Sequence, residues 1–360
     1  MRHVVDTKTR EQTINSYIIM KRAFLFLISI MLLTSCGEEI KRKSMGAPFE
    51  VMLVCEDDVW DSAAGIAIEQ VLKTPVPGLP QKEASFKVTR RNNEGFGITE
   101  QAFRNVILVD INSSHSKCEF RFDRDIYASP QIVMAIYAPD NKSFGEFVTK
   151  NARVVLDFFT EKEREFQIAE LQNSYNKQAF SLIKSKFGCE MKIPSSISGY
   201  KQGKDFLWFS DYNNPSKVEM QSFAVYSYPY TSTDNFSKEH FIHMRDSVMK
   251  ENIPGGEPDS YIQTDAATVT LTDVAYNGKY MSVARGLWYM KNDDMFGGGP
   301  FVSHSIVDEE NGKVIVVEAF VYAPNKAKGG FMRKLESSLH TLRLPIDLAT
   351  ANNGTTENNK

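Results

Sequence analysis

The first half of the chain alternates short apolar runs with amphipathic segments. Apolar runs of strand length occur at 49–54, 86–89, 106–111, 119–122 and 131–137. Apolar residues at helical spacing predict helices at 60–72, after Asp57 and Asp58 as helix-start residues, and at 144–159. The mixture of both element types over 49–160 predicts an N-terminal α+β half.

The middle of the chain carries one long apolar stripe. Ile168, Leu171, Tyr175, Ala179 and Leu182 follow one another at steps of three and four. We therefore expect a single connecting helix at 161–188, with Gly188 as its C-terminal cap. Its remaining positions are polar, so packing between the two halves explains the stripe.

The second half, 189–345, is rich in strands. Runs with strand character occupy 205–210, 219–228, 267–276, 281–290, 302–307 and 313–322, and helices are predicted at 236–250 and 328–342. Ser237 or Asp234 can cap the first of these helices. Asn311-Gly312 predicts a type I′ hairpin turn between the last two strands. The tail at 346–360 is polar, and we expect it to be disordered.

A short motif occurs in both halves. Residues 132–147 read IVMAIYAPDNKSFGEF and residues 317–331 read VEAFVYAPNKAKGGF. Each predicts a strand that ends in Tyr-Ala-Pro and a helix that begins after Asn-Lys, with Asn as a potential cap. The fold expected is α+β: two related α/β-sandwich-like halves with largely antiparallel sheets, joined by a long central helix. Chance similarity of a common strand–turn–helix unit is the alternative.

The N-terminal segment has the pattern of a targeting signal. Lys21 and Arg22 precede an apolar run at 23–33, which is too short for a membrane span and typical of a secretory signal. Leu33-Thr34-Ser35-Cys36 resembles a bacterial lipobox, which implies cleavage before Cys36 and lipid, including palmitate, on it. We expect residues 1–19 to be an over-extended start and 20–35 a lipoprotein signal peptide.

Residues 36–48 form a polar tether. Glu38-Glu39 shortly after Cys36 resembles a surface-export signal of Bacteroidetes-type lipoproteins, and a plain solvated tether explains the same pair. The expected location is the outer membrane of the cell envelope, on the periplasmic side or on the cell surface. Acyl chains supply the membrane affinity, at about 0.8 kcal/mol per buried methylene.

Composition narrows the classes of function. The 360 residues carry 42 Lys plus Arg against 45 Asp plus Glu, a net charge of −3, and removal of the leader makes the chain more acidic. That balance argues against nucleic-acid binding. With Cys36 lipidated, Cys55, Cys118 and Cys189 allow at most one disulfide, and their spacing fits no zinc motif.

The densest set of candidate ligand-binding residues lies at 285–301. Arg285 and Trp288 precede Asp293 and Asp294, and Gly297-Gly298-Gly299 follow. Glycines permit close backbone approach to a ligand, and an aromatic ring can serve as a platform for a sugar. A hairpin connection also needs flexible residues, so both interpretations of Gly298 and Gly299 stay open. Residues 285 and 288 are three apart, which places them on opposite faces of a strand.

The histidines give no catalytic motif. His240 and His243 share a helix face, but no third ligand accompanies them and HExxH is absent, so solvated helix positions explain them. His115, His304 and His340 are scattered. Neither GxSxG nor a nucleotide-binding glycine motif occurs. We expect no metal and no cofactor.

Taken together, these segments resemble an uncharacterised lipoprotein family of Bacteroidetes that is defined only as a domain of unknown function. The resemblance rests on the lipobox, the opening strand Phe-Glu-Val-Met-Leu-Val, Arg-Gly-Leu-Trp and the Gly-Gly-Pro-Phe segment. It covers Cys36 to about Leu344 and implies an envelope location without an activity.

The function expected is a non-enzymatic binding or assembly module. Its partners are the membrane, through the N-terminal lipid, and an envelope protein or a glycan, with no nucleic acid. The alternative is an envelope hydrolase acting on glycan or peptide, with a site near 293–301 formed by Asp293, Asp294 or His304.

Overall fold

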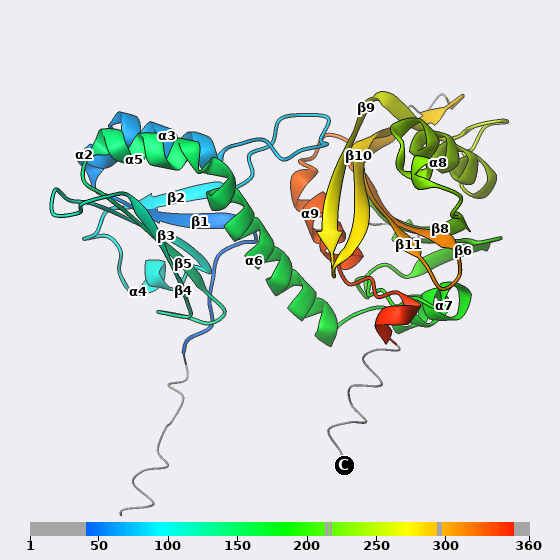
Figure 1. The fold of residues 1–360 in the computed structure, drawn as a ribbon, viewed down its shortest axis with the longest axis horizontal. Coiled ribbons are helices and arrows are strands. Elements are labelled where there is room, and N and C mark those ends of the chain that lie inside the picture. Colours follow the sequence, from blue (N-terminus) through cyan, green and yellow to red (C-terminus); the bar gives the residue numbers. More distant parts are fainter. Residues whose placement is uncertain (1–40, 213–215, 217, 294–296, 349–360) are drawn as a thin grey trace, which may run out of the picture. The chain divides into compact units, whose positions relative to one another are not determined.

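The computed structural model describes residues 41–212, 216, 218–293 and 297–348. Within these ranges the strands form one sheet of five strands and one of seven (Figure 1). The predicted α+β class with two sheet halves is confirmed. The leader, Cys36 and the tail beyond residue 348 lie outside the described residues, so the expectations placed on them stay predictions.

The first sheet is mostly parallel. Its order is β2-β1-β3-β5-β4, and its strands are β1 (Glu50–Val54), β2 (Lys87–Arg91), β3 (Asn105–Ile111), β4 (Glu119–Arg124) and β5 (Ile132–Ala138). Only the edge strand β4 pairs antiparallel in this sheet. Seven of the ten strand pairings in the described residues are antiparallel, as predicted, but the three parallel ones all fall here. The physical reason is that long crossovers, of which those after β1 and β2 contain helices, connect these strands.

Helices cover one face of this sheet. They are α2 (Asp57–Trp60), α3 (Ala63–Leu72), α5 (Asn141–Lys150) and the start of α6 (Ala152–Asn173), while the short α4 (Ile98–Gln101) follows β2. Ile68, Phe144 and Phe159 from these helices pack with Leu53 and Ile136 from the strands. The first half therefore has one large apolar core between sheet and helices.

The connecting helix is divided, which corrects the prediction of one helix at 161–188. α6 ends at Asn173, and α7 (Lys177–Phe187) begins after Asn176, whose side chain accepts a hydrogen bond from the Ala179 amide. The Asn176 side chain also donates to the Ile197 carbonyl at 2.6 Å. The apolar stripe hides this break because it continues through both helices. Gly188 adopts φ 69° and ends α7, as predicted.

The second sheet is entirely antiparallel in its described pairings. Its order is β6-β7-β8-β12-β11-β10-β9, and its strands are β6 (Gly199–Gly203), β7 (Phe206–Ser210), β8 (Met220–Pro229), β9 (Tyr261–Tyr276), β10 (Lys279–Lys291), β11 (Gly298–Asp308) and β12 (Lys313–Tyr322).

The tight hairpin turn is not where it was predicted. Asp308 pairs with Lys313, so four residues join β11 to β12, and only Gly312 of the Asn311-Gly312 pair has a positive φ. A type I′ turn needs positive φ at both central residues. Asn277 (φ 50°) and Gly278 (φ 76°) meet that requirement between β9 and β10.

Both faces of the second sheet are covered. α7 and α9 (Gly329–Leu339) pack on one face, where Ile183 and Leu335 meet Val317. α8 (Lys238–Asn252), which follows the 3-10 helix η1 (Thr233–Phe236), packs on the other, where Phe241 meets Phe320. Figure 1 shows α8 and α9 beside the strands of this sheet. The three-layer arrangement explains why β12 is buried along nearly its whole length.

The likeness between the halves ends at a strand–turn–helix unit. β5 leads into α5 and β12 leads towards α9, as the repeated motif predicts. The two sheets nevertheless differ in strand number, order and direction. The expected Asn caps are also absent, because Asp140 caps α5 and Glu83 accepts from the Lys328 and Gly329 amides at the start of α9.

Cys55, Cys118 and Cys189 are free thiols. Burial raises the pKa of Cys55 to about 11 and that of Cys189 to about 12, so both behave as apolar core residues. No helix in the described part of the chain is long and apolar enough to cross a membrane.

Candidate functional site

Arg285 lies on β10 and faces α9. Its guanidinium donates to both carboxylate oxygens of Glu336, from Nη2 to Oε1 at 2.5 Å and from Nη1 to Oε2 at 3.0 Å. Burial raises the pKa of Glu336, but the charge and hydrogen bonds of Arg285, together with the neighbouring His304 and His340, outweigh burial and hold it well below its ordinary value. The Arg285 guanidinium therefore forms an internal ion pair with Glu336.

Trp288 lies on the other face of the sheet, as a spacing of three along a strand predicts. Only 3% of it is exposed, and its ring lies 5.8 Å from the Phe320 ring in an edge-to-face arrangement. The expectation that Trp288 offers a platform to a ligand is corrected, because its ring forms part of the core beneath α8.

Gly298 and Gly299 belong to a strand rather than to a loop. They begin β11 and pair with Tyr289 and Trp288. A Cβ atom on Gly299 would lie 1.9 Å from the Val321 carbonyl oxygen and 3.4 Å from Trp288 Nε1. These glycines are required for close packing between strands, which replaces the binding-loop interpretation.

The structure describes only one of the two predicted aspartates. Asp293 is half-buried near the start of the β10–β11 connection, where its Oδ2 would lie 2.9 Å from a Cβ atom on Gly255. Asp294 lies outside the described residues.

His304 is separated from this connection. It lies on β11 six residues beyond Gly298, which corresponds to roughly 20 Å along a strand. It is 1% exposed, and burial lowers its pKa to about 4. Asp293 and His304, the two described residues among the three named for the alternative hydrolase, are therefore not brought together.

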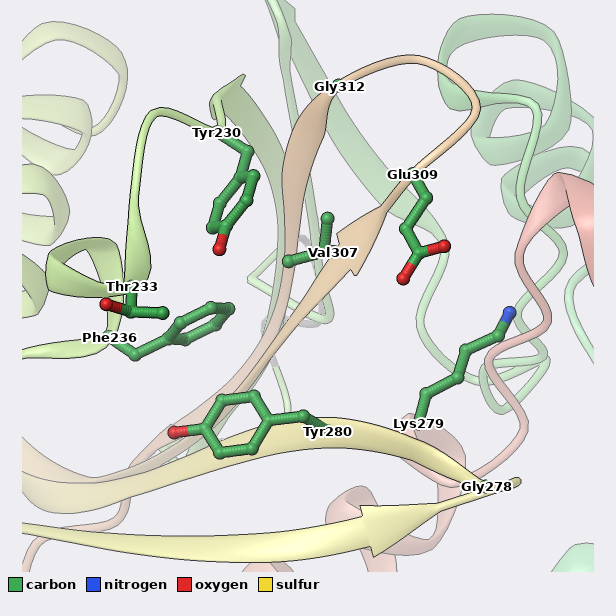
Figure 2. A pocket seen from close by; sticks show the side chains of 9 residues that line it. All are labelled: Tyr230, Thr233, Phe236, Gly278, Lys279, Tyr280, Val307, Glu309 and Gly312. Atoms are coloured by element: carbon green, nitrogen blue, oxygen red, sulfur yellow. The ribbon is translucent and has the colours of Figure 1, made fainter.

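A pocket of about 670 Å³ opens elsewhere on the second sheet (Figure 2). Its walls come from the segment after β8, from η1, from the β9–β10 turn and from the β11–β12 connection. The lining residues are Tyr230, Thr233, Phe236, Gly278, Lys279, Tyr280, Val307, Glu309 and Gly312. The volume falls within the range of small-molecule sites, about 300–1,000 Å³.

Three aromatic rings line this pocket and hold one another in place. Phe236 and Tyr280 meet edge to face at 4.9 Å between ring centroids, and Tyr230 lies 6.2 Å from Phe236. The Tyr280 hydroxyl donates to Asp273 Oδ1 at 2.7 Å. Burial and this contact raise the pKa of Tyr280, so the phenol is neutral at physiological pH.

Buried hydrogen bonds fix the backbone beside the rings. The Asn235 side chain, 4% exposed, accepts from the Thr231 amide at 2.8 Å and from the Ser232 amide at 3.1 Å. The Tyr230 amide donates to the Gly312 carbonyl at 2.9 Å, which ties the first wall to the β11–β12 connection. The pocket is therefore formed before any ligand enters.

Two side chains of opposite charge stand on one side of the pocket. Figure 2 shows the ends of Lys279 and Glu309 on the same side, away from the rings. Lys279 Nζ also lies 2.8 Å from Asp347 Oδ1. Aromatic faces beside one cation and one anion suit an uncharged, polar ligand with several hydroxyl groups.

Two local signals of this pocket were present in the sequence. Asn277-Gly278 between two strand-like runs is a hairpin signature. Ser232 and Asn235 form a reciprocal capping box before α8. Neither signal shows that Phe236 and Tyr280 meet, because that contact depends on how η1 packs against β10.

Two family models match the chain, each over one half. Residues 44–172 match a domain of unknown function (DUF8532), and residues 176–341 match a domain of unknown function (DUF4837). The boundary between the matches falls at the break between α6 and α7. The expected relation to domains of unknown function is borne out, with two models in place of one.

Curated proteins give no match. Among solved structures, the Saccharomyces cerevisiae Ran-binding protein Mog1p is similar at 7% identity and a TM-score of 0.28, over 44% of this chain and 90% of that one. A mutant of Mog1 has the same TM-score and identity, over 43% and 90%. A Bacteroides thetaiotaomicron protein is similar at 11% identity and a TM-score of 0.19, over 43% and 44%. Scores this low place no constraint on function.

Proposed function

We propose that this protein is a lipid-anchored, non-enzymatic binding protein of the bacterial cell envelope and that its aromatic pocket binds a glycan. The observation that carries the binding role is the pocket of Tyr230, Phe236 and Tyr280 with Lys279 and Glu309 beside it. Sugar rings present C–H groups that pack on aromatic faces and hydroxyls that hydrogen-bond to charged side chains. A pre-formed pocket also lowers the entropic cost of binding.

The anchor rests on the sequence. Lys21 and Arg22, the apolar run at 23–33 and the Cys at position 36 support export and lipidation. The proposed location is the outer membrane, on the periplasmic side or on the cell surface. The only membrane contact in this proposal is the lipid, because two or more acyl chains are sufficient for stable anchoring.

The anchor can be tested in cells that express the full chain. Cys36→Ser is expected to move the protein from the membrane fraction to the soluble fraction and to abolish palmitate incorporation. Cys118→Ser is the matched control and is expected to change neither. Membrane association that persists in the Cys36 variant would overturn the anchor.

The pocket can be tested by calorimetric titration with oligosaccharides released from the envelope of the producing cells. Tyr280→Ala is expected to weaken binding at least about 10-fold, because it removes one of the three rings. Tyr289→Ala is the control, since Tyr289 lies on the same strand and is similarly exposed, 43% against 46%, but does not line the pocket.

Equal loss of affinity in both tyrosine variants would contradict a role for this pocket. Failure of the wild-type protein to bind any oligosaccharide fraction would contradict the glycan proposal itself.

A further inference from the structure

Three side chains that commonly bind metals converge between β11 and α9. His304 comes from the strand, Glu336 from the helix and His340 from the helix C-cap position. Each histidine Nε2 lies 3.8 Å from Oε1 of Glu336. In the described part of the chain this is the one group of three such residues whose ligand atoms all lie within 4.8 Å of one another.

The buried histidine has unused hydrogen-bonding capacity. His304 is 1% exposed, and neither of its ring nitrogens has a hydrogen-bond partner. Buried polar atoms are bonded in the great majority of cases, so two unpaired nitrogens on one ring call for an explanation. The His304 and His340 rings meet edge to face at 4.8 Å, which keeps both beside the carboxylate.

Arg285 holds that carboxylate in place. Its two hydrogen bonds fix both oxygens of Glu336, and Oε1 is the oxygen that faces the two histidines. Carboxylates that bind metals are themselves usually hydrogen-bonded to a further side chain, which sets their direction. Arg285 is therefore a positioning residue for the cluster.

The cluster has an entry path. His340 is partly exposed and lines a cavity of about 370 Å³ together with Tyr276, Lys192 and Arg343. The Tyr276 hydroxyl donates to the His340 carbonyl at 2.7 Å, which anchors the end of α9 at the cavity wall. An ion bound to His340 would therefore lie close to space that can hold a water molecule or an anion as a further ligand.

We propose that His304, Glu336 and His340 bind a divalent transition-metal ion of the Zn²⁺ class. Two imidazoles and one carboxylate are a common ligand set for such ions, with one position left open. Metal–ligand bonds of about 2.1 Å in a tetrahedral site separate ligand atoms by roughly 3.4 Å. The two histidine–carboxylate separations of 3.8 Å are a few tenths of an ångström longer, and all three ligand atoms lie within 4.8 Å of one another, so side-chain rotations are needed to bring them to one ion.

The proposal is independent of the aromatic pocket and is tested with Zn²⁺ alone. The full-length protein, without a histidine tag, is solubilised in detergent, stripped with a chelator and titrated by calorimetry. The expected result is one high-affinity ion per chain. His340→Gln and Glu336→Gln are each expected to lower the affinity at least about 10-fold, with an unchanged far-UV circular dichroism spectrum.

His243→Gln is the matched control, because His243 is an exposed histidine on α8. It is expected to leave the affinity unchanged. Arg285→Lys keeps the positive charge but removes the two-pronged contact, and is expected to lower the affinity about 10–100-fold, as for residues that orient metal ligands. Co²⁺ bound to the wild-type protein is expected to give a visible ligand-field spectrum that changes in His340→Gln.

Three results would overturn the proposal: no stoichiometric binding by the wild-type protein, an unchanged affinity in both His340→Gln and Glu336→Gln, or an equal loss in His243→Gln. Should His340→Gln fail to fold, the Co²⁺ spectrum of the Glu336→Gln protein decides the question in its place.

Discussion

The two faces of the second sheet each hold an arginine–glutamate pair between a strand and a helix, but the pairs are built in opposite ways. Beneath α8, the helix supplies Arg245 and β12 supplies Glu318. Beneath α9, β10 supplies the arginine, Arg285, and the helix supplies Glu336. One pair stabilises the fold, and the other has side chains beside it that can still bind a ligand.

The α8 pair is closed, in the sense that both side chains are fully buried. Neither Arg245 nor Glu318 has exposed side-chain surface, and Arg245 donates to both carboxylate oxygens and, at 2.8 Å, to Thr264 Oγ1. The guanidinium also lies 4.2 Å from the centre of the Phe301 ring. Good geometry and additional bonds are the conditions under which a buried pair offsets its desolvation cost.

The α9 pair is open, in the sense that part of it is exposed to solvent. A quarter of the Arg285 side chain is exposed. Glu336 faces two histidines, and neither ring nitrogen of the buried one, His304, has a hydrogen-bond partner. The two helices also differ in how their first backbone amides are capped. Ser237 caps α8 from the adjacent position in the chain, whereas Glu83, far away in the sequence, binds the first amides of α9. The start of α8 is thus capped by a neighbouring residue, whereas the start of α9 is held by a distant segment.

The largest expected effect is on the closed pair. Arg245→Met leaves Glu318 buried without a partner, and we expect a loss of about 3–5 kcal/mol in the free energy of unfolding. Urea unfolding followed by circular dichroism measures it. The double variant Arg245→Met, Glu318→Leu is the control and is expected to recover most of the loss, because apolar residues replace both charges. A loss below about 1 kcal/mol in the single variant would contradict the structural role.

A smaller effect is expected on the open pair. Arg285→Met should cost about 1.5–3 kcal/mol, the range for hydrogen bonds to charged groups. The loss is smaller than for Arg245 because solvent and the neighbouring His340 can compensate Glu336. The same urea titration measures it. Arg153→Met is the control, since its ion pair with Asp157 is exposed and is expected to contribute less than about 1 kcal/mol. A loss equal to that of Arg245→Met would remove the distinction between the pairs.

The same contrast explains what the sequence could predict. Ser237 as a cap, Gly188 as a helix end and the opposite directions of Arg285 and Trp288 all depend on residues a few positions apart. The break at Ser174–Asn176 was missed because periodicity continues across it. The parallel pairing of the first sheet was missed because pairing direction depends on the path of the connections.

The cluster of His304, Glu336 and His340 could not be predicted from the sequence, for a related reason. Glu336 and His340 are four apart on one helix, a spacing visible in the sequence. Their meeting with His304 and Arg285 requires α9 to lie across β10 and β11, and no local pattern encodes that placement. Of the residues predicted to bind a ligand, Trp288 and Gly299 instead pair with each other within the sheet.

The smallest expected effect tests how α9 is held. A Cβ atom on Gly330 would meet nothing within 4 Å, whereas one on Gly329 would lie 2.9 Å from Glu83 Oε2. Gly330→Ala is therefore expected to stabilise the protein by about 0.4–1 kcal/mol, because alanine reduces the entropy of the unfolded chain. Gly329→Ala gains the same entropy but must displace the Glu83 carboxylate, so thermal unfolding should rank it below Gly330→Ala. Equal shifts in melting temperature would mean that moving the Glu83 carboxylate costs nothing, which would contradict its role in holding the start of α9.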